Sequence, residues 1–132
     1  MYAYFFTSTI KDWNHLLQPN KYKEIIIESL TYLTKSQRVK VYAFVLMPNH
    51  IHLIWEIMQG HDLADVQRDF LKYLSQQIKF DLEKNHPKVL EKFKVNLKDR
   101  KYRFWQDRSL SIRLYNDEIF MQKLHFIHEN PL

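Results

Sequence analysis

Two hydrophobic periodicities along the chain predict the order of its elements. Runs of aromatic and β-branched residues predict strands over 2–10, 39–47, 50–57 and 110–115. Apolar positions spaced three and four residues apart predict helices over 21–36, 62–84 and 117–130. The segment 11–20 is polar and predicts a loop, and 89–103 is too highly charged to assign. The expected order is therefore β-α-β-β-α-(β)-α.

Turn and capping residues sharpen this pattern at two places. Pro48 and Asn49 separate two adjacent strands, which indicates an antiparallel hairpin. Asn116 and Asp117 stand where the cap of the last helix is expected, and acidic residues suit that end of a helix. We expect an α+β fold, with an antiparallel sheet that carries helices on one face. The pattern has no repeat and no linker, which predicts one domain over residues 1–132.

Composition excludes several classes of protein. Of the 132 residues, 45% are hydrophobic and 15% aromatic, enough to bury a core. A single glycine excludes a glycine-rich phosphate loop, and the absence of cysteine excludes disulfide scaffolds, cysteine zinc sites and thiol nucleophiles. No apolar run is long enough to span a membrane, and the first residues are typical of a strand and not of a signal peptide. These features predict a soluble, cytoplasmic protein with no membrane partner.

Positive charge is concentrated between residues 84 and 103 of a chain whose net charge is +5. Aromatic residues are interleaved with or adjoin these cations, namely Phe93, Tyr102, Phe104 and Trp105. Cations contact phosphates and aromatic rings stack on unpaired bases, so the pattern suits single-stranded nucleic acid. The alternative is a solvated connector whose aromatics lie in the core. The candidate DNA-binding residues are Lys94, Lys98, Arg100, Lys101, Arg103, Trp105 and Arg108.

Two histidines stand two residues apart in the predicted strand over 50–57. Side chains alternate along a strand, so His50 and His52 share one face while Ile51 and Leu53 point to the other. Two imidazoles on one face can share a divalent metal ion. The alternative is a pair of half-exposed histidines with no ligand. Asn49 either orients a ligand or serves only as the turn residue.

The last predicted helix offers a further ligand for such a metal. Its apolar stripe comprises Phe120, Leu124 and Ile127, and Phe126 lies off this stripe. The candidate polar residues on this helix are His125, His128, Glu129 and Asn130. They reach the histidine pair only if the helix crosses the sheet face that carries it.

Three segments together resemble a known family. Residues 42–54, YAFVLMPNHIHLI, resemble the HUH motif region of single-tyrosine transposases, best of all the REP-associated tyrosine transposases, which are related to small insertion-sequence transposases. Phe104-Trp105-Gln106 resembles a segment before the last strand of that branch, and residues 126–131 resemble its C-terminal Tyr-Ile-x-x-Asn-Pro motif. The resemblance implies a ferredoxin-like or RRM-like HUH nuclease fold with a catalytic C-terminal helix.

The same resemblance implies a site and a reaction. His50, His52 and Asn130 would hold Mg²⁺ or Mn²⁺, and the metal would polarise a DNA phosphate. A tyrosine hydroxyl would attack the phosphorus, forming a 5′-phosphotyrosine bond and releasing a 3′-OH. The implied partner is single-stranded DNA next to a hairpin, and a homodimer is possible in the family.

The chain departs from the family at the nucleophile. Phe126 stands where the family has its tyrosine, and phenylalanine has no hydroxyl. The tyrosine was replaced, or the chain is a naturally inactivated copy, or Tyr115 or Tyr102 serves instead. Two hypotheses remain: a metal-dependent single-stranded DNA transposase, whose activity as written is left open by Phe126, or a domesticated or degenerate protein that binds hairpin DNA without cutting it. A weaker third is a small nucleic-acid-binding domain with structural histidines.

Overall fold

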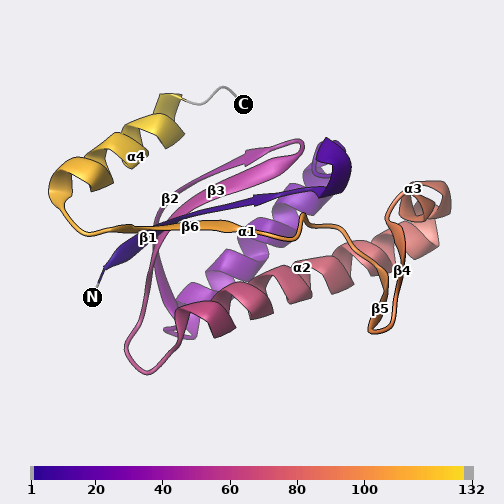
Figure 1. The fold of residues 1–132 in the computed structure, drawn as a ribbon, viewed down its shortest axis with the longest axis horizontal. Helices are drawn as coiled ribbons and strands as arrows, with labels where there is room; N and C mark the ends of the chain where they lie inside the picture. The colour runs from indigo at the N-terminus through magenta and orange to yellow at the C-terminus, as the bar shows by residue number, and fades with distance from the viewer. Residues whose placement is uncertain (1, 130–132) are drawn as a thin grey trace.

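The computed structural model describes residues 2–129 and forms one four-stranded sheet with helices on both of its faces (Figure 1). The strands are β1 (Ala3–Thr9), β2 (Val39–Met47), β3 (His50–Ile57), β4 (Lys94–Leu97), β5 (Arg100–Tyr102) and β6 (Leu110–Leu114). The helices are η1 (Lys11–Trp13, a 3₁₀ turn), α1 (Asn20–Lys35), α2 (Leu63–Asn85), α3 (Pro87–Glu91) and α4 (Asp117–Glu129).

The main sheet has the order β2-β3-β1-β6, and every neighbouring pair is antiparallel. The hairpin predicted around Pro48 and Asn49 is confirmed, with Met47 opposite His50 across the turn. β1 and β3 are the central strands, so each is paired on both sides. The antiparallel α+β class is therefore confirmed.

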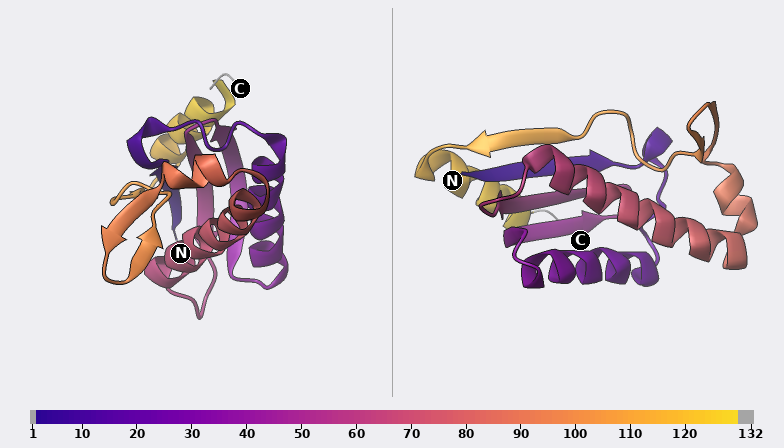
Figure 2. Two further views of the ribbon diagram at one scale, coloured as in Figure 1. Left: turned by 90° about the vertical axis from the view of Figure 1, so that its right-hand side faces the viewer. Right: turned by 90° about the horizontal axis from the view of Figure 1, so that it is seen from below.

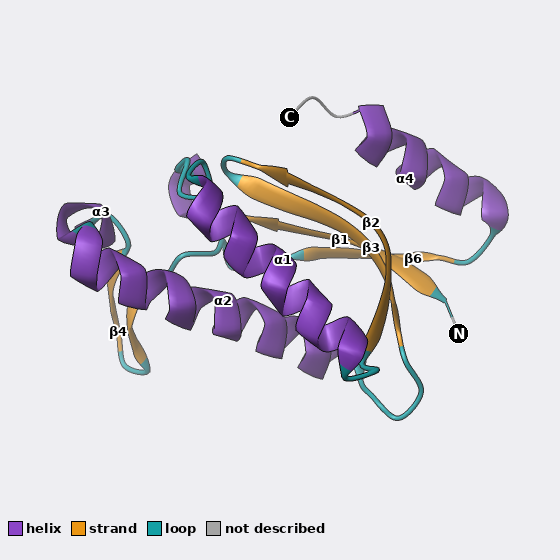
Figure 3. Cartoon of the chain, turned by 180° about the vertical axis from the view of Figure 1, so that it is seen from behind, coloured by secondary structure: helices purple, strands orange, loops and turns teal. Residues whose placement is uncertain are grey.

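The expectation that the helices cover one face was wrong. α1 and α2 pack on one face, where Phe6 and Trp55 meet Phe70 of α2. α4 crosses the opposite face, where Ile127 packs with Ile54 (Figure 3). The physical reason lies in β3, because five consecutive residues, 51–55, are buried and both faces of that strand need a cover.

The two long helices are amphipathic and are joined by a polar network at one end. Asp81 of α2 accepts a hydrogen bond from the Tyr22 hydroxyl at 2.6 Å and another from the Asn85 amide, and it forms an ion pair with Lys21 at 2.8 Å. Partial burial acts to raise the pKa of Asp81, but these partners outweigh it and lower the pKa to about 2. Among residues 2–129 no helix is both long and apolar enough to cross a membrane.

The segment left unassigned by its charge contains α3 and the small β4–β5 hairpin. This hairpin stands beside the C-terminal part of α2, away from the main sheet (Figure 2). Phe93 and Phe104 are buried with their ring centroids 5.1 Å apart, and they attach the segment to the core. Except for the half-buried Arg103, the charged residues between them are exposed, so the two short strands show no hydrophobic alternation in the sequence.

Candidate metal centre and nucleic-acid surface

His50 and His52 lie side by side on the face of β3 that α4 crosses. Their ring centroids are 4.7 Å apart and the rings are nearly perpendicular. They stand opposite Thr9 and Thr7 of β1, while Ile51 belongs to the core on the other face. The shared face predicted from the alternation is confirmed. The last helix crosses that face, which is the condition for its side chains to reach the histidine pair.

Each imidazole is held through its Nδ1 atom. His50 Nδ1 lies 2.7 Å from Asn49 Oδ1, and because an amide oxygen only accepts, His50 Nδ1 donates. His52 Nδ1 lies 2.7 Å from the Thr7 hydroxyl, which accepts when Nδ1 carries the proton. Among residues 2–129 neither Nε2 has a hydrogen-bond partner, so both can present a lone pair. Histidine ligands of metals are commonly oriented through the other ring nitrogen in this way.

Burial favours the neutral form of both imidazoles. Burial lowers the pKa of His52 to about 4, with smaller contributions from the charges of His50 and Lys123. Burial also lowers the pKa of His50. A metal ion binds the neutral form of imidazole, so the pair needs no deprotonation at pH 7. The donor set and its protonation therefore fit a divalent cation.

Phe126 of α4 lies directly against this pair. Its ring makes edge contacts with His52 at 5.1 Å and with Phe5 at 5.8 Å, measured between centroids. The side chain is 46% exposed, while the adjacent Ile127 is buried in the core. The expected position off the apolar stripe is confirmed, and it places Phe126 beside the histidines, where its ring has no group to act as a nucleophile.

The two alternative tyrosines lie elsewhere in the fold. Tyr115 follows Leu114, which pairs with Ala3, whereas His50 pairs with Thr9 at the other end of β1. Six residues of strand separate those two ends, a distance of roughly 20 Å. Tyr102 lies on the β4–β5 hairpin beside α2. Neither tyrosine is placed to serve the histidine pair in this chain.

A third metal ligand does not come from the described part of α4. Within residues 2–129, no group of three or more His, Asp or Glu side chains could hold a metal ion. His125, His128 and Glu129 are exposed and do not complete the pair. Asn130, the ligand that the family resemblance implies, lies outside the described residues.

The basic residues expected to bind DNA fall into two groups. Lys94, Lys98, Arg100 and Lys101 are exposed on and around the β4–β5 hairpin, and Arg108 is exposed beyond it. Arg103 is half-buried and forms an ion pair with Asp107. The hairpin is therefore a mainly cationic, solvent-facing projection, which suits contact with phosphates.

Trp105 does not belong to that surface. Its ring is only 7% exposed, and its Nε1 donates a hydrogen bond to Ser75 Oγ of α2 at 3.0 Å. The expectation that a base stacks on Trp105 is corrected because the ring is almost wholly buried, although Trp105 still lines the groove between α2 and the segment 99–109. The same holds for Phe93 and Phe104, so the core alternative is right for these three. Tyr102 remains partly exposed.

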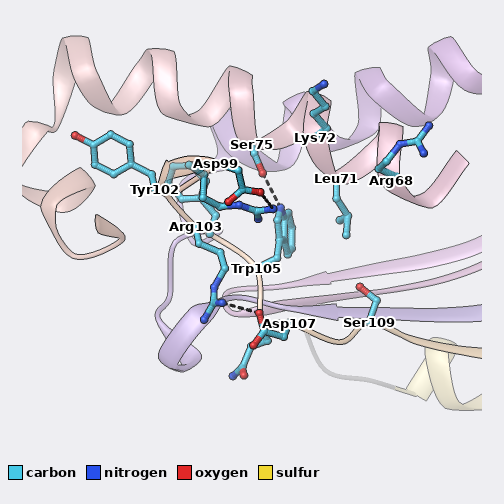
Figure 4. Close-up of a pocket in the computed structure, with 13 residues that line it drawn as sticks. Arg68, Leu71, Lys72, Ser75, Asp99, Tyr102, Arg103, Trp105, Asp107 and Ser109 are labelled. Atoms are coloured by element: carbon cyan, nitrogen blue, oxygen red, sulfur yellow. Dashed lines mark hydrogen bonds and ion pairs between the residues drawn. The ribbon is translucent and has the colours of Figure 1, made fainter. Parts of the chain in front are cut away.

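A groove of about 620 Å³ runs between α2 and the segment 99–109 (Figure 4). The sequence analysis missed its α2 wall, which carries Arg68, Lys72 and Ser75. Most amphipathic helices carry cations on their solvent-facing side, so Arg68 and Lys72 give no signal in the sequence. Only the folded structure shows that they line the same groove as Arg100 and Arg103.

The groove adjoins the hairpin, since Arg100 and Tyr102 line both. Three of its cations, Arg68, Arg100 and Arg103, form ion pairs with neighbouring aspartates, whereas Lys72 forms none among the described residues.

The groove approaches the same end of the sheet as the histidine pair. Gln106 N–H donates to Thr9 O and Ile10 N–H donates to Asn49 O, both at 2.8 Å. These bonds tie the wall of the groove to the end of β1, and the end of β1 to the turn before His50. A nucleic acid lying in the groove would therefore meet the histidine site around this end of the sheet.

An antiparallel sheet with paired histidines beneath a crossing helix is the arrangement that the HUH resemblance led us to expect. Residues 2–114 match the family described as Transposase IS200 like. The chain belongs to this family of transposases. Among curated proteins, none matches the chain.

Two solved structures share the fold. One is a REP-associated tyrosine transposase bound to a REP hairpin, with a TM-score of 0.70 and 19% identity over 98% of this chain. This chain spans 66% of that protein's length. The other is a protein of Deinococcus radiodurans R1 described as a candidate transposase, with a TM-score of 0.61 and 13% identity. The match covers 96% of this chain and 88% of that one.

Proposed function

We propose that the chain carries the DNA-binding and metal-binding apparatus of a single-stranded DNA transposase, with Phe126 in the position of the nucleophilic tyrosine. The observation that carries the proposal is the packing of the Phe126 ring on His52, next to His50. A side chain at position 126 would therefore lie next to a DNA phosphate held at the histidines.

His50 and His52 would hold Mg²⁺ or Mn²⁺, with Asn130 as a further ligand. Such an ion, when bound, polarises a phosphodiester and stabilises charge on its oxygens. The chain's own residues set up this chemistry: Asn49 and Thr7 fix the two rings through Nδ1, and burial keeps both rings neutral. A tyrosine hydroxyl at position 126 would attack the phosphorus, forming the phosphotyrosine bond as the bond to the 3′-oxygen breaks.

The DNA partner that we propose is a hairpin with a single-stranded flank. The exposed cations of the β4–β5 hairpin and the groove beside α2 would contact the phosphates of the stem. The path past the end of β1 would bring the single-stranded flank to the histidines. A REP hairpin is bound by the transposase of similar fold, which supports this class of partner. A homodimer and a cytoplasmic location stay predictions.

A second function is favoured by Phe126 itself. Without a hydroxyl beside the histidines, the chain would recognise hairpin DNA and leave it uncut. Both functions share the binding surface and differ only in the chemical step. Detection of nicking by the unaltered chain would contradict this second function and the position assigned to the nucleophile.

Mn²⁺ titration by calorimetry at pH 7 tests the site, with and without a DNA hairpin that has single-stranded flanks. The unaltered chain should bind Mn²⁺ saturably, and His52→Ala should abolish binding. His61→Ala is the matched control, because His61 is exposed in the loop after β3 and its loss should change nothing. Absence of Mn²⁺ binding both with and without DNA would overturn the metal site.

A further inference from the structure

Lys123 of α4 is a cation beside the histidine pair that the proposed function does not use. Its ammonium lies 4.9 Å from the centroid of the Phe5 ring, and Phe5 stacks on His52 at 5.3 Å. Lys123 precedes Phe126 by three residues, so the two side chains lie on neighbouring positions of one helix face. The half-buried Lys123 is therefore held above the same site from the same helix.

The charge of this site is not balanced by the protein. Among residues 2–129, no carboxylate forms an ion pair with Lys123, although eight other ion pairs are present. No acidic side chain joins the two imidazoles in a metal-binding group among these residues. A divalent ion held there would add its charge to that of Lys123. An anionic ligand would balance both charges.

We propose that Lys123 is a phosphate-binding residue of this site, contacting a non-bridging oxygen of the DNA phosphodiester that the histidines present. The inference rests on the proposed function, since it assumes that single-stranded DNA reaches the histidine pair. An ammonium that packs on the face of Phe5 is kept at the site and remains free to donate to an oxygen. Lys123 thereby selects a phosphodiester over a neutral ligand.

The alternative is that Lys123 only covers the Phe5 ring with its aliphatic stem. DNA binding separates these roles. In both roles the ammonium repels a divalent ion when no DNA is present. Only a phosphate-binding cation also strengthens DNA binding. Loss of the charge should therefore weaken the DNA complex and strengthen binding of the metal alone.

The experiment compares Lys123→Gln and Lys123→Arg with the unaltered chain. Lys35→Gln is the matched control, because Lys35 is exposed at the end of α1 on the far side of the sheet. One probe is a fluorescent DNA hairpin with single-stranded flanks, titrated over a series of salt concentrations. The other is Mn²⁺ alone, measured by calorimetry at pH 7.

Lys123→Gln should reduce the slope of log K against log salt by about 0.7, the share of one single-strand phosphate contact. It should raise the affinity for Mn²⁺ about fivefold, from the Coulomb repulsion of a single and a double charge roughly 8 Å apart in water. Lys123→Arg should keep the unaltered values. A slope equal to that of the Lys35→Gln control would overturn the inference, whatever the metal result. A fall of the salt slope in Lys123→Gln, with no Mn²⁺ binding by either this variant or the unaltered chain, is a separate outcome. That result would support the phosphate contact of Lys123 and contradict only the metal site.

Discussion

Replacement of Thr7 by valine removes the hydroxyl that orients His52 and leaves the shape of the side chain nearly unchanged. The Thr7 Oγ1 atom lies 2.7 Å from His52 Nδ1, and it accepts a hydrogen bond from Nδ1 in the tautomer whose Nε2 is free to bind a metal. Without the hydroxyl, that tautomer loses its acceptor. The ring orientation that presents Nε2 to the site also loses its support.

The expected cost follows from the place of this bond in the structure. Partners that orient a metal-binding histidine are typically worth a ten- to hundredfold change in metal affinity. Thr7 is half-buried, so water can partly replace its hydroxyl, and the lower end of that range applies. We expect Thr7→Val to weaken Mn²⁺ binding by about tenfold, equivalent to about 1.4 kcal/mol.

Calorimetric titration with Mn²⁺ at pH 7 measures this effect directly. Thr9→Val is a matched control, because Thr9 lies on the same face of β1 opposite His50 and has no side-chain hydrogen bond among the described residues. Thr9→Val should bind Mn²⁺ like the unaltered chain. Equal affinity of Thr7→Val and the unaltered chain would refute the argument that the Thr7 hydroxyl stabilises the metal-binding tautomer and orientation of His52.

Three further predictions concern the basic region and the core. Replacing Lys94, Lys98 and Lys101 together by glutamine should reduce the salt slope of hairpin binding by about 3, the share of three duplex phosphate contacts, and an unchanged slope would show that the β4–β5 hairpin does not contact the DNA. Trp105→Phe should lower the melting temperature but change DNA affinity less than twofold, since its ring is buried; a large loss of affinity at unchanged stability would restore the stacking role. Because its pKa is about 2 when folded, Asp81 stabilises the fold above about pH 4 and loses that effect as the pH falls toward 2. Asp81→Asn should cost about 1 kcal/mol at pH 7, after allowance for solvent screening, and flatten the urea-unfolding profile between pH 4 and 2; a profile parallel to the unaltered chain's would refute this.

The sequence was most informative where periodicity and burial agree. The strands over 39–47 and 50–57 have the predicted bounds, and the long helices differ by about one residue at each end. The cover on the second sheet face was missed because residues 51–55, four apolar residues and His52, signal burial on both sides and were interpreted only through the alternation of His50 and His52. The β4–β5 hairpin was missed because its strands are short and exposed and show no apolar alternation.

Side-chain contacts were predictable only in part. The alternation of a strand places His50 and His52 together, but nothing local in the sequence indicates that Thr7 of another strand would orient His52. The aromatic character of Trp105 is equally compatible with stacking on a base and with burial against α2. Its hydrogen bond to Ser75, thirty residues away in the chain, decides between them. Contacts of this kind depend on packing between distant segments.

The most direct test of the central claim is restoration of the missing hydroxyl. Phe126→Tyr is mixed with Mn²⁺ and a DNA hairpin whose single-stranded flanks are randomised, so that no target sequence need be known. A denaturing gel should show a covalent protein–DNA product, which the unaltered chain does not form and which His52→Ala in the same variant abolishes. A Phe126→Tyr protein that binds the hairpin and Mn²⁺ yet forms no covalent product would contradict the account.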